Sequence, residues 1–285
     1  MMRGDLVCNN FGTVNGLPDW HGSRDNVIMS DYKDCYVAFL DILGFKSLLK
    51  TEKCNDIKQL FDILVNFVPR LLTKNNEVYN KARYYIMSDS VVVYINSRYE
   101  NAFMALTEIC LQIQVKLAAC NPPVLIRGAI EKGQLYHKGN IIFGEALSNA
   151  YVLESTLAKY PRIIFTDATR RAGLKNTGKF YVFDYNQMFY KIDEDLLYYI
   201  DCFNTFDYIP SLNISSVSEA VDFENIYFER LLNYTEERLG VETNSSIRDK
   251  YLWLRRKILQ KVEKKLSNRT LWAEKNADCF RKLCG

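Results

Sequence analysis

Hydrophobic and polar positions follow two different periods along residues 35–166, which predicts an ordered mixture of strands and helices. Apolar runs of strand character occupy 35–42, 124–130 and 162–166. The segment 78–95 is predicted to form two strands, because a short polar break at Ser88 and Asp89 divides two apolar stretches. Apolar residues recur at helical spacing over 56–72, 100–119 and 145–158.

The order of these segments is strand, helix, strand, strand, helix, strand, which predicts an α+β fold with the ferredoxin-like βαββαβ arrangement. A further helix and strand follow it, after a glycine-punctuated loop at 133–144. The predicted division is an N-terminal arm at 1–33, an α+β domain at 34–217 and a helical C-terminal extension at 218–285, with the Tyr- and Asp-rich stretch 184–213 as the transition.

Two aspartates interrupt the apolar strands: Asp41 in YVAFLDILGF at 36–45, and Asp89 in YYIMSDSVVVYI at 84–95. A buried carboxylate needs a cation or strong hydrogen bonds. The first strand lies beside the hairpin in the predicted topology, so both acids can meet at one end of the sheet. Two carboxylates about 4 Å apart repel by roughly 4 kcal/mol at an effective dielectric near 20, which favours a bound cation or a proton on one of them. The alternatives are a strand-end cap for Asp41 and a turn residue for Asp89.

The composition of the chain argues against several classes of function. The chain has 285 residues, enough for a substantial core, and a net charge of +3, which is too small to indicate nucleic-acid binding alone. It shows no long apolar stretch for a membrane span and no signal peptide. Its eight cysteines form no CxxC pair, which favours reduced thiols and a cytoplasmic location. With only two histidines, a histidine triad or a histidine-rich zinc site is not expected.

Four motifs stand in order along the chain: FLDILGF at 39–45, SDS at 88–90, RGAIEKG at 127–133 and FGEALSNAYVLES at 143–155. Together they resemble the class III nucleotidyl cyclases, and the resemblance spans 36–166, with 34–217 as the cyclase catalytic domain. More narrowly, the RGAI and AYVLE segments, followed by YPRII at 160–164, are similar to the pyrimidine cyclases of Pycsar anti-phage defence.

The resemblance implies that Asp41 and Asp89 bind two Mg²⁺ or Mn²⁺ ions, with the backbone carbonyl of Ile42 as a further ligand. It also implies that the segment after the first strand offers backbone N–H groups to phosphate oxygens, from Gly44, Phe45, Lys46 and Ser47. The reaction would convert a nucleoside triphosphate to a 3′,5′-cyclic nucleotide and pyrophosphate. Class III sites form across a head-to-tail dimer, so a homodimer is expected.

The chain departs from the purine cyclases at the positions that read the base, where Tyr85 replaces a lysine and Ile141 replaces an acid or threonine. Ser148 and Val152 replace the asparagine and arginine that act on the transition state. These departures favour a pyrimidine substrate. Arg127 and Arg162 are then the candidate cations for phosphate charge, unless they pair structurally with acids. Tyr85 has the alternative of strand packing.

The predicted function is a UTP cyclase that makes cyclic UMP, whose product activates a separate effector during phage infection. The alternatives are a CTP cyclase, an inactive cyclase-like module that senses a nucleotide, and a palm-type polymerase. No membrane or nucleic-acid partner is expected. The basic helix around 250–265 has packing or dimerisation as its default role.

Overall fold

The computed structural model describes residues 31–73, 77–178, 190–203 and 217–267. The chain divides into two compact units, Met1–Asp31 and Tyr32–Gly285. The predicted arm at 1–33 therefore lies almost entirely outside the described residues, and everything below concerns the second unit. The three domain boundaries expected from the sequence stay a prediction.

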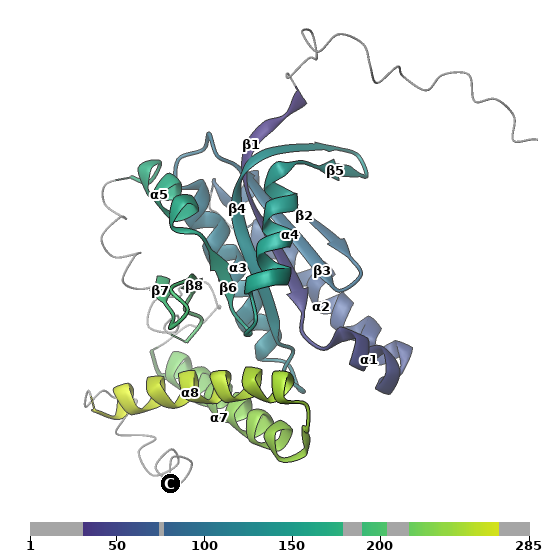
Figure 1. Cartoon of the computed structure of the whole chain (residues 1–285), viewed down its shortest axis with the longest axis vertical. Helices are drawn as coiled ribbons and strands as arrows, with labels where there is room; N and C mark the ends of the chain where they lie inside the picture. The colour runs from purple at the N-terminus through teal and green to yellow at the C-terminus, as the bar shows by residue number, and fades with distance from the viewer. Residues whose placement is uncertain (1–30, 74–76, 179–189, 204–216, 268–285) are drawn as a thin grey trace, which may run out of the picture. The chain divides into compact units, whose positions relative to one another are not determined.

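The centre of the second unit is an antiparallel sheet with the strand order β2-β3-β1-β4. These strands are β1 (Lys33–Ile42), β2 (Arg83–Met87), β3 (Ser90–Asn96) and β4 (Ile126–Lys138). The connections run through α2 (Cys54–Leu72), between β1 and β2, and α3 (Ala102–Ala118), between β3 and β4. This order confirms the α+β class and the ferredoxin-like arrangement (Figure 1).

Further short strands widen the sheet beyond β4. β6 (Ile163–Phe165) pairs parallel with β4, and β8 (Tyr198–Ile200) and β7 (Tyr190–Ile192) continue as antiparallel neighbours. The predicted strand at 162–166 is thus confirmed as β6. The β7–β8 hairpin lies in the stretch predicted to be a transition. Of that stretch, 184–189 and 204–213 lie outside the described residues.

The predicted loop at 133–144 is wrong, because β4 continues to Lys138 and pairs with β5 (Ile141–Phe143). Gly133 suggested a loop, but it lies inside β4, where the backbone of Ala146 would be 3.4 Å from an added Cβ atom. A small residue there lets α4 (Glu145–Leu157) approach the strand. The sequence analysis also missed α1 (Phe45–Thr51) and α5 (Asp167–Lys175), which are too short for a clear helical period.

The two faces of the sheet are covered differently. On one face, β1 residues such as Tyr36 and Leu40 join the large apolar core with α2 and α3. On the other, Val37 and Phe39 pack with Ala146 and Ala150 of α4 in a much smaller cluster. Figure 1 shows α4 lying across this second face. Alternation along β1 assigns Asp41 to the same face as Phe39.

Two long helices, α7 (Val217–Val241) and α8 (Ser245–Ser267), confirm the helical C-terminal extension. Trp253 holds α8 against the sheet domain: its indole stacks on the ring of Tyr160 with a centroid distance of 5.4 Å, and its Nε1–H donates to Asp193 Oδ2 at 2.7 Å. Lys257, on the same side of the helix, places Nζ 2.8 Å from Asp193 Oδ1. Buried polar contacts therefore attach the extension.

None of the described helices combines the length and the apolar character that crossing a membrane requires.

The close approach of β1 and β4 at Gly128 gives a test of the sheet. A Cβ atom there would lie 2.6 Å from the Phe39 carbonyl oxygen and 2.6 Å from Leu40 Cδ2. We therefore expect Gly128→Ala to lower the free energy of unfolding by about 1–3 kcal/mol, measured by urea denaturation. The control is Gly240→Ala in α7, where nothing lies within 4 Å, and there we expect no loss or a gain of about 0.5–1 kcal/mol. An unchanged urea midpoint for Gly128→Ala would contradict the strand spacing.

Candidate active site

Asp41 and Asp89 meet at one end of the sheet. Asp41 lies next to the end of β1, opposite Ser90 of β3 and Arg127 of β4. Asp89 lies in the turn between β2 and β3, and its carbonyl oxygen accepts a hydrogen bond of 3.0 Å from the Ile42 N–H. This bond ties the turn to the end of β1 and brings the two carboxyl groups within hydrogen-bonding reach of each other. The structure thus places both acids at one end of the sheet, while their metal-binding role stays a prediction.

Burial raises the pKa of Asp41. The Arg127 guanidinium opposes this increase, and the neighbouring charge of Asp89 adds to it. Asp41 is therefore a half-buried carboxylate whose single cationic contact does not fully offset desolvation and like-charge repulsion. A cation bound between the two acids would relieve both costs.

Arg127 lies between two acids and is fixed by them. Its Nε is 3.3 Å from Asp41 Oδ2 and 2.6 Å from Glu154 Oε1, and its Nη1 donates to the Ala158 carbonyl oxygen at 3.3 Å. The side chain is 23% exposed, so the guanidinium remains accessible beside the acid pair. Of the two arginines predicted to supply positive charge, Arg127 is the one that the structure brings to the acids.

Glu154 is a site residue that the sequence analysis did not identify. It lies on the inner side of α4, 2% exposed, four residues after the buried Ala150. Burial raises the pKa of Glu154 to about 7; Arg127 opposes this, and the charges of Asp41 and Asp89 add to it. The signal in the sequence was an acid on the apolar face of a predicted helix, which alone indicates only a buried hydrogen bond.

Arg162 is not part of this group. It is 1% exposed, and its guanidinium pairs with Asp193 and Asp195 while lying over the rings of Tyr160 and Trp253. A buried guanidinium held by two carboxylates has no surface to offer a phosphate group. The expected phosphate role of Arg162 is therefore replaced by a structural role, the attachment of the β7–β8 hairpin and α8.

The segment predicted to bind phosphate forms the turn from β1 into α1. Gly44 adopts the left-handed region with φ of 76°, which favours glycine, and it precedes the seven-residue helix. The Phe45 ring is buried against Phe61 at 5.8 Å, and Lys46 is exposed. The Ser47 N–H donates to the Gly44 carbonyl oxygen at 2.8 Å, so the turn itself uses this amide.

Tyr85 lies on the same face of the sheet as the acid pair. It is opposite Val92 in β3, which is in turn opposite Phe39 in β1, two residues before Asp41. Its hydroxyl donates to the Asn140 carbonyl oxygen at 3.5 Å, and its ring contacts His137 edge-on at 6.4 Å. Tyr85 therefore stands between the acid end of the sheet and the β4–β5 hairpin.

The oxygen donors at this site suit a metal that is shared with a substrate. Within the described residues, no group of three or more His, Cys, Asp or Glu side chains is arranged to hold a metal ion. The pair of carboxylates, with the neighbouring Ile42 carbonyl, is a small set of hard oxygen ligands. Mg²⁺ is commonly bound in this way, by one or two carboxylates together with water and substrate phosphates. The residues therefore fit Mg²⁺ or Mn²⁺.

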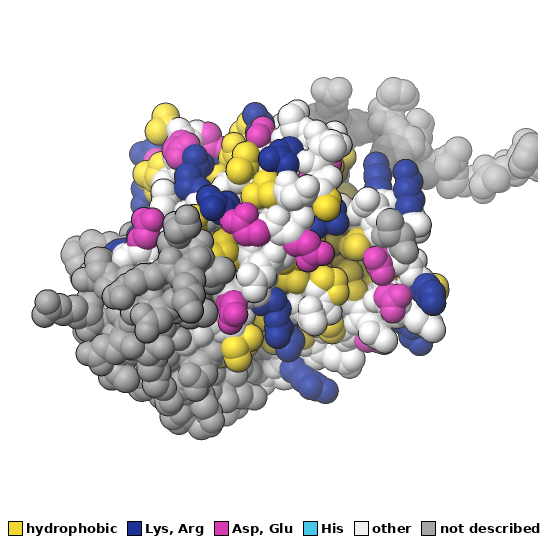
Figure 2. Space-filling view, turned by 90° about the horizontal axis from the view of Figure 1, so that it is seen from below, with side chains coloured by type: hydrophobic (Ala, Val, Ile, Leu, Met, Phe, Trp, Pro, Cys, Tyr) yellow, Lys and Arg dark blue, Asp and Glu magenta, His cyan; other side chains and the backbone are white. Residues whose placement is uncertain are grey.

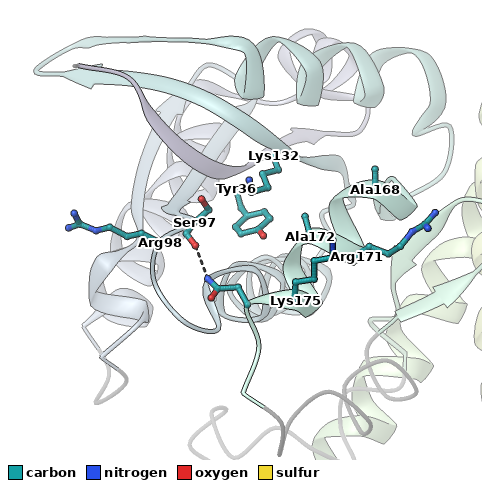
Figure 3. Close-up of a pocket in the computed structure, with 9 residues that line it drawn as sticks. Tyr36, Ser97, Arg98, Lys132, Ala168, Arg171, Ala172 and Lys175 are labelled. Carbon is teal, nitrogen blue, oxygen red and sulfur yellow. Dashed lines mark hydrogen bonds between the residues drawn. The ribbon is translucent and has the colours of Figure 1, made fainter. Parts of the chain in front are cut away.

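A cavity of about 460 Å³ lies near the other end of β1, beside Tyr36, and several of its charged lining residues are paired with acids or turned away from it. Lys132 on its wall pairs with Asp34, and Arg171 pairs with Asp167. Figure 3 shows Arg98 and Arg171 pointing away from the cavity. The acid end of the sheet remains the better candidate.

A comparison with protein families found no match, and neither did a comparison with curated proteins. Among solved structures, a bacterial light-regulated adenylyl cyclase shows 13% identity and a TM-score of 0.45, over 70% of this chain and 58% of that one. An adenylate/guanylate cyclase/hydrolase from Silicibacter pomeroyi shows 14% identity and a TM-score of 0.39, over 49% of this chain and 79% of that one.

A class III adenylyl cyclase-like ATP-binding protein from Pseudomonas aeruginosa shows 12% identity and a TM-score of 0.39, over 58% of this chain and 38% of that one. The structures to which this chain is similar thus include class III cyclases. At these identities and scores, the similarity carries no argument about activity.

The Glu154 carboxyl gives a pH test of the site. An acid whose pKa rises from 4.5 to about 7 on folding binds more protons in the folded state between these values, so stability falls as the pH rises through this window. We expect the free energy of unfolding of the unsubstituted protein to fall relative to that of Glu154→Gln between about pH 4.5 and pH 7, measured by urea denaturation in EDTA.

The matched control is Glu145→Gln, an exposed position in the first turn of α4, whose profile should run parallel to that of the unsubstituted protein. A Glu154→Gln profile that also runs parallel would show that folding does not change the proton affinity of Glu154.

Proposed function

We propose that the chain is a metal-dependent nucleotide cyclase that converts a pyrimidine nucleoside triphosphate to its 3′,5′-cyclic nucleotide and pyrophosphate. UTP is the preferred substrate and CTP the second choice. The observation that carries this proposal is the meeting of Asp41 and Asp89 beside Arg127 at one end of a ferredoxin-like sheet.

In the proposed reaction, the ribose 3′-oxygen forms a bond to the α-phosphorus, the bond from that phosphorus to the leaving pyrophosphate breaks, and the 3′-hydroxyl loses its proton. Mg²⁺ or Mn²⁺, when bound, polarises the phosphate oxygens and lowers the pKa of the hydroxyl. Asp41 and Asp89 would hold the ions through their carboxylates, with the Ile42 carbonyl as a further donor.

Arg127 is oriented by Glu154 and would stabilise the charge on the phosphate oxygens. Glu154 forms an ion pair with Arg127, although its Oε1 accepts no hydrogen bond, and no other described side chain of the site is placed as an evident general base. The proton would therefore pass to a substrate phosphate oxygen or to water.

Tyr85 is the proposed contact for the pyrimidine base. It lies on the α4 face of the sheet, and its hydroxyl is fixed by the Asn140 carbonyl oxygen. A tyrosine ring at a position where purine cyclases carry lysine would narrow the space for the base and remove the cation that reads a purine. The smaller pyrimidine ring is then the better fit.

A homodimer is proposed because the α4 face is incompletely covered in a single chain. Exposed apolar side chains occur on α4, on β5 and at the tip of the β2–β3 hairpin, namely Tyr151, Val152, Phe143 and Met87, of which Met87 is 57% exposed. A second copy would cover such residues and complete the pocket. Ile141, Ser148 and Val152, where purine cyclases read the base or act on the transition state, are all exposed on this same side.

The proposed setting is the cytoplasm, with a separate effector that responds to the cyclic product during phage infection. All five cysteines in the described residues, Cys35, Cys54, Cys110, Cys120 and Cys202, are free thiols, which fits a reducing compartment.

The second candidate is a sensor that binds a nucleotide without turning it over, favoured by Ser148 and Val152 in place of the asparagine and arginine of active cyclases. Retention of the acid pair favours the enzyme. The polymerase alternative needs a basic surface for nucleic acid. Figure 2, which views the molecule from below relative to Figure 1, instead shows acidic and basic side chains interspersed over the described part of this side.

The test is incubation of the purified protein with each of ATP, GTP, CTP and UTP and Mn²⁺, with product identification by mass spectrometry. We expect cyclic UMP and pyrophosphate from UTP. Asp41→Asn and Asp89→Asn should each lower turnover by at least about a hundredfold, because metal contacts contribute several kcal/mol to the transition state. Asp56→Asn, at an exposed position in α2, is the control and should leave turnover unchanged.

Saturable nucleotide binding without any cyclic product would favour the sensor, and primer extension would favour the polymerase. Full turnover by either site variant would remove the metal assignment.

The base assignment predicts that Tyr85→Lys lowers the UTP:ATP ratio of kcat/KM by about tenfold, because the ring that limits the pocket is lost and a purine-reading cation is restored. Tyr85→Phe keeps the ring and should keep the ratio. If the ratio is unchanged in Tyr85→Lys, Tyr85 does not read the base.

A further inference from the structure

The C-terminal helix α8 reaches the same end of the sheet as the acid pair. Trp253 of α8 stacks on Tyr160, which follows the α4 C-terminus. Two residues before Tyr160, the Ala158 carbonyl oxygen accepts a hydrogen bond from Arg127. A short chain of contacts thus connects α8 with the site, and Figure 1 shows the N-terminal half of α8 passing beneath this end of the sheet.

Lys250 lies three residues before Trp253 and therefore on the same side of α8. Its side chain is half-buried and within electrostatic range of Asp41, Arg127 and Glu154. Among the described residues, the ion pairs of α8 within 4 Å involve Arg255, Arg256, Lys257 and Lys265 but not Lys250.

The position of Lys250 is costly in the free protein. Burial lowers its pKa, the positive charge of Arg127 adds to this effect, and the charges of Asp41 and Glu154 oppose it. An ammonium group held near a second cation, without an ion pair of its own, is satisfied best by a further anion. A bound triphosphate would be such an anion. Arg127 alone would not balance its charge, because two carboxylates already engage the Arg127 guanidinium.

We propose that Lys250 is a phosphate-binding residue of the active site, supplied by the C-terminal helix of the same chain. This inference rests on the proposed function and names the group that Lys250 binds: the triphosphate of the nucleotide. Lys250 would supply the positive charge that is missing because Val152 stands where active purine cyclases carry arginine.

The attachment of α8 supports this role. Arg162, Trp253 and Lys257 all bond to the buried Asp193 carboxylate, which fixes the position of the helix relative to the sheet. Lys250 lies one turn further toward the N-terminus of α8, on the side of the helix that this attachment turns toward the sheet. The helical extension thereby becomes part of the site.

The test is isothermal titration of inorganic tripolyphosphate into the full-length protein with excess Mg²⁺. Tripolyphosphate has no ribose and cannot be cyclised, so binding is measured without turnover. We expect Lys250→Gln to weaken binding by about ten- to a hundredfold, as for loss of one charge-assisted contact, with a thermal midpoint that is unchanged or higher. Arg256→Gln removes the same charge from an exposed position of α8 and should change binding by less than about twofold.

Tripolyphosphate binding by Lys250→Gln at the unsubstituted affinity would overturn the inference, as would an equal loss in Arg256→Gln, which would indicate only a general charge effect. If Lys250→Gln does not fold, Lys250→Met replaces it under the same criteria.

The two proposals fail separately. No cyclic nucleotide from any triphosphate, with binding that still depends on Lys250, would refute the cyclase and support the inference. Turnover of UTP by the unsubstituted protein, together with unchanged tripolyphosphate binding by Lys250→Gln, would support the cyclase and refute the inference. An unsubstituted protein that binds no tripolyphosphate overturns the inference as well.

Discussion

The interaction on which the site depends is the contact of one guanidinium with a crowded group of carboxylates. Four structural elements are needed to assemble it: the register of β1 and β4 sets Asp41 opposite Arg127, the β2–β3 turn supplies Asp89, and α4 supplies Glu154. Arg127 contacts two of these acids and Lys250 lies within electrostatic range, yet burial in that group still raises the pKa values of Asp41 and Glu154. The resulting demand for positive charge is the basis of the proposed metal site.

The sequence predicted the acid pair because each acid interrupts an apolar strand and the order of elements makes those strands neighbours. It did not predict the pairing of Arg127 with Glu154, because that contact depends on the rotation of α4 over the sheet. The β4–β5 hairpin was missed for a related reason: Gly133 indicated a loop, whereas it permits close packing of Ala146. Arg162 was misjudged because its partner Asp193 lies thirty-one residues away, in a hairpin without strong periodicity.

The buried charged groups around Asp193 fix the orientation of α8 relative to the sheet. Replacing such a cluster by apolar residues is often neutral or stabilising, so its contribution to stability is a weak reason for its presence. Its bonds are directional, however: Lys257 and the Trp253 indole approach one carboxylate from α8, and Arg162 approaches it from the residue before β6. An apolar contact would allow α8 to slide or rotate, whereas this arrangement fixes the side of the helix that faces the sheet.

The fixed orientation of α8 contrasts with the incomplete covering of the α4 face of the sheet. The α2 and α3 face of the sheet holds a large core, while the α4 face keeps exposed apolar residues next to charged ones. The helix α8 lies beneath the acid end of the sheet, and the α4 face carries the exposed apolar side chains that the proposed second copy would cover. The charge that holds phosphate would then come from within the chain, through Arg127 and Lys250, and the partner would mainly exclude water. A nucleotide bound there would be positioned by the chain that holds its metal ligands, which separates the binding of the triphosphate from the assembly of the dimer.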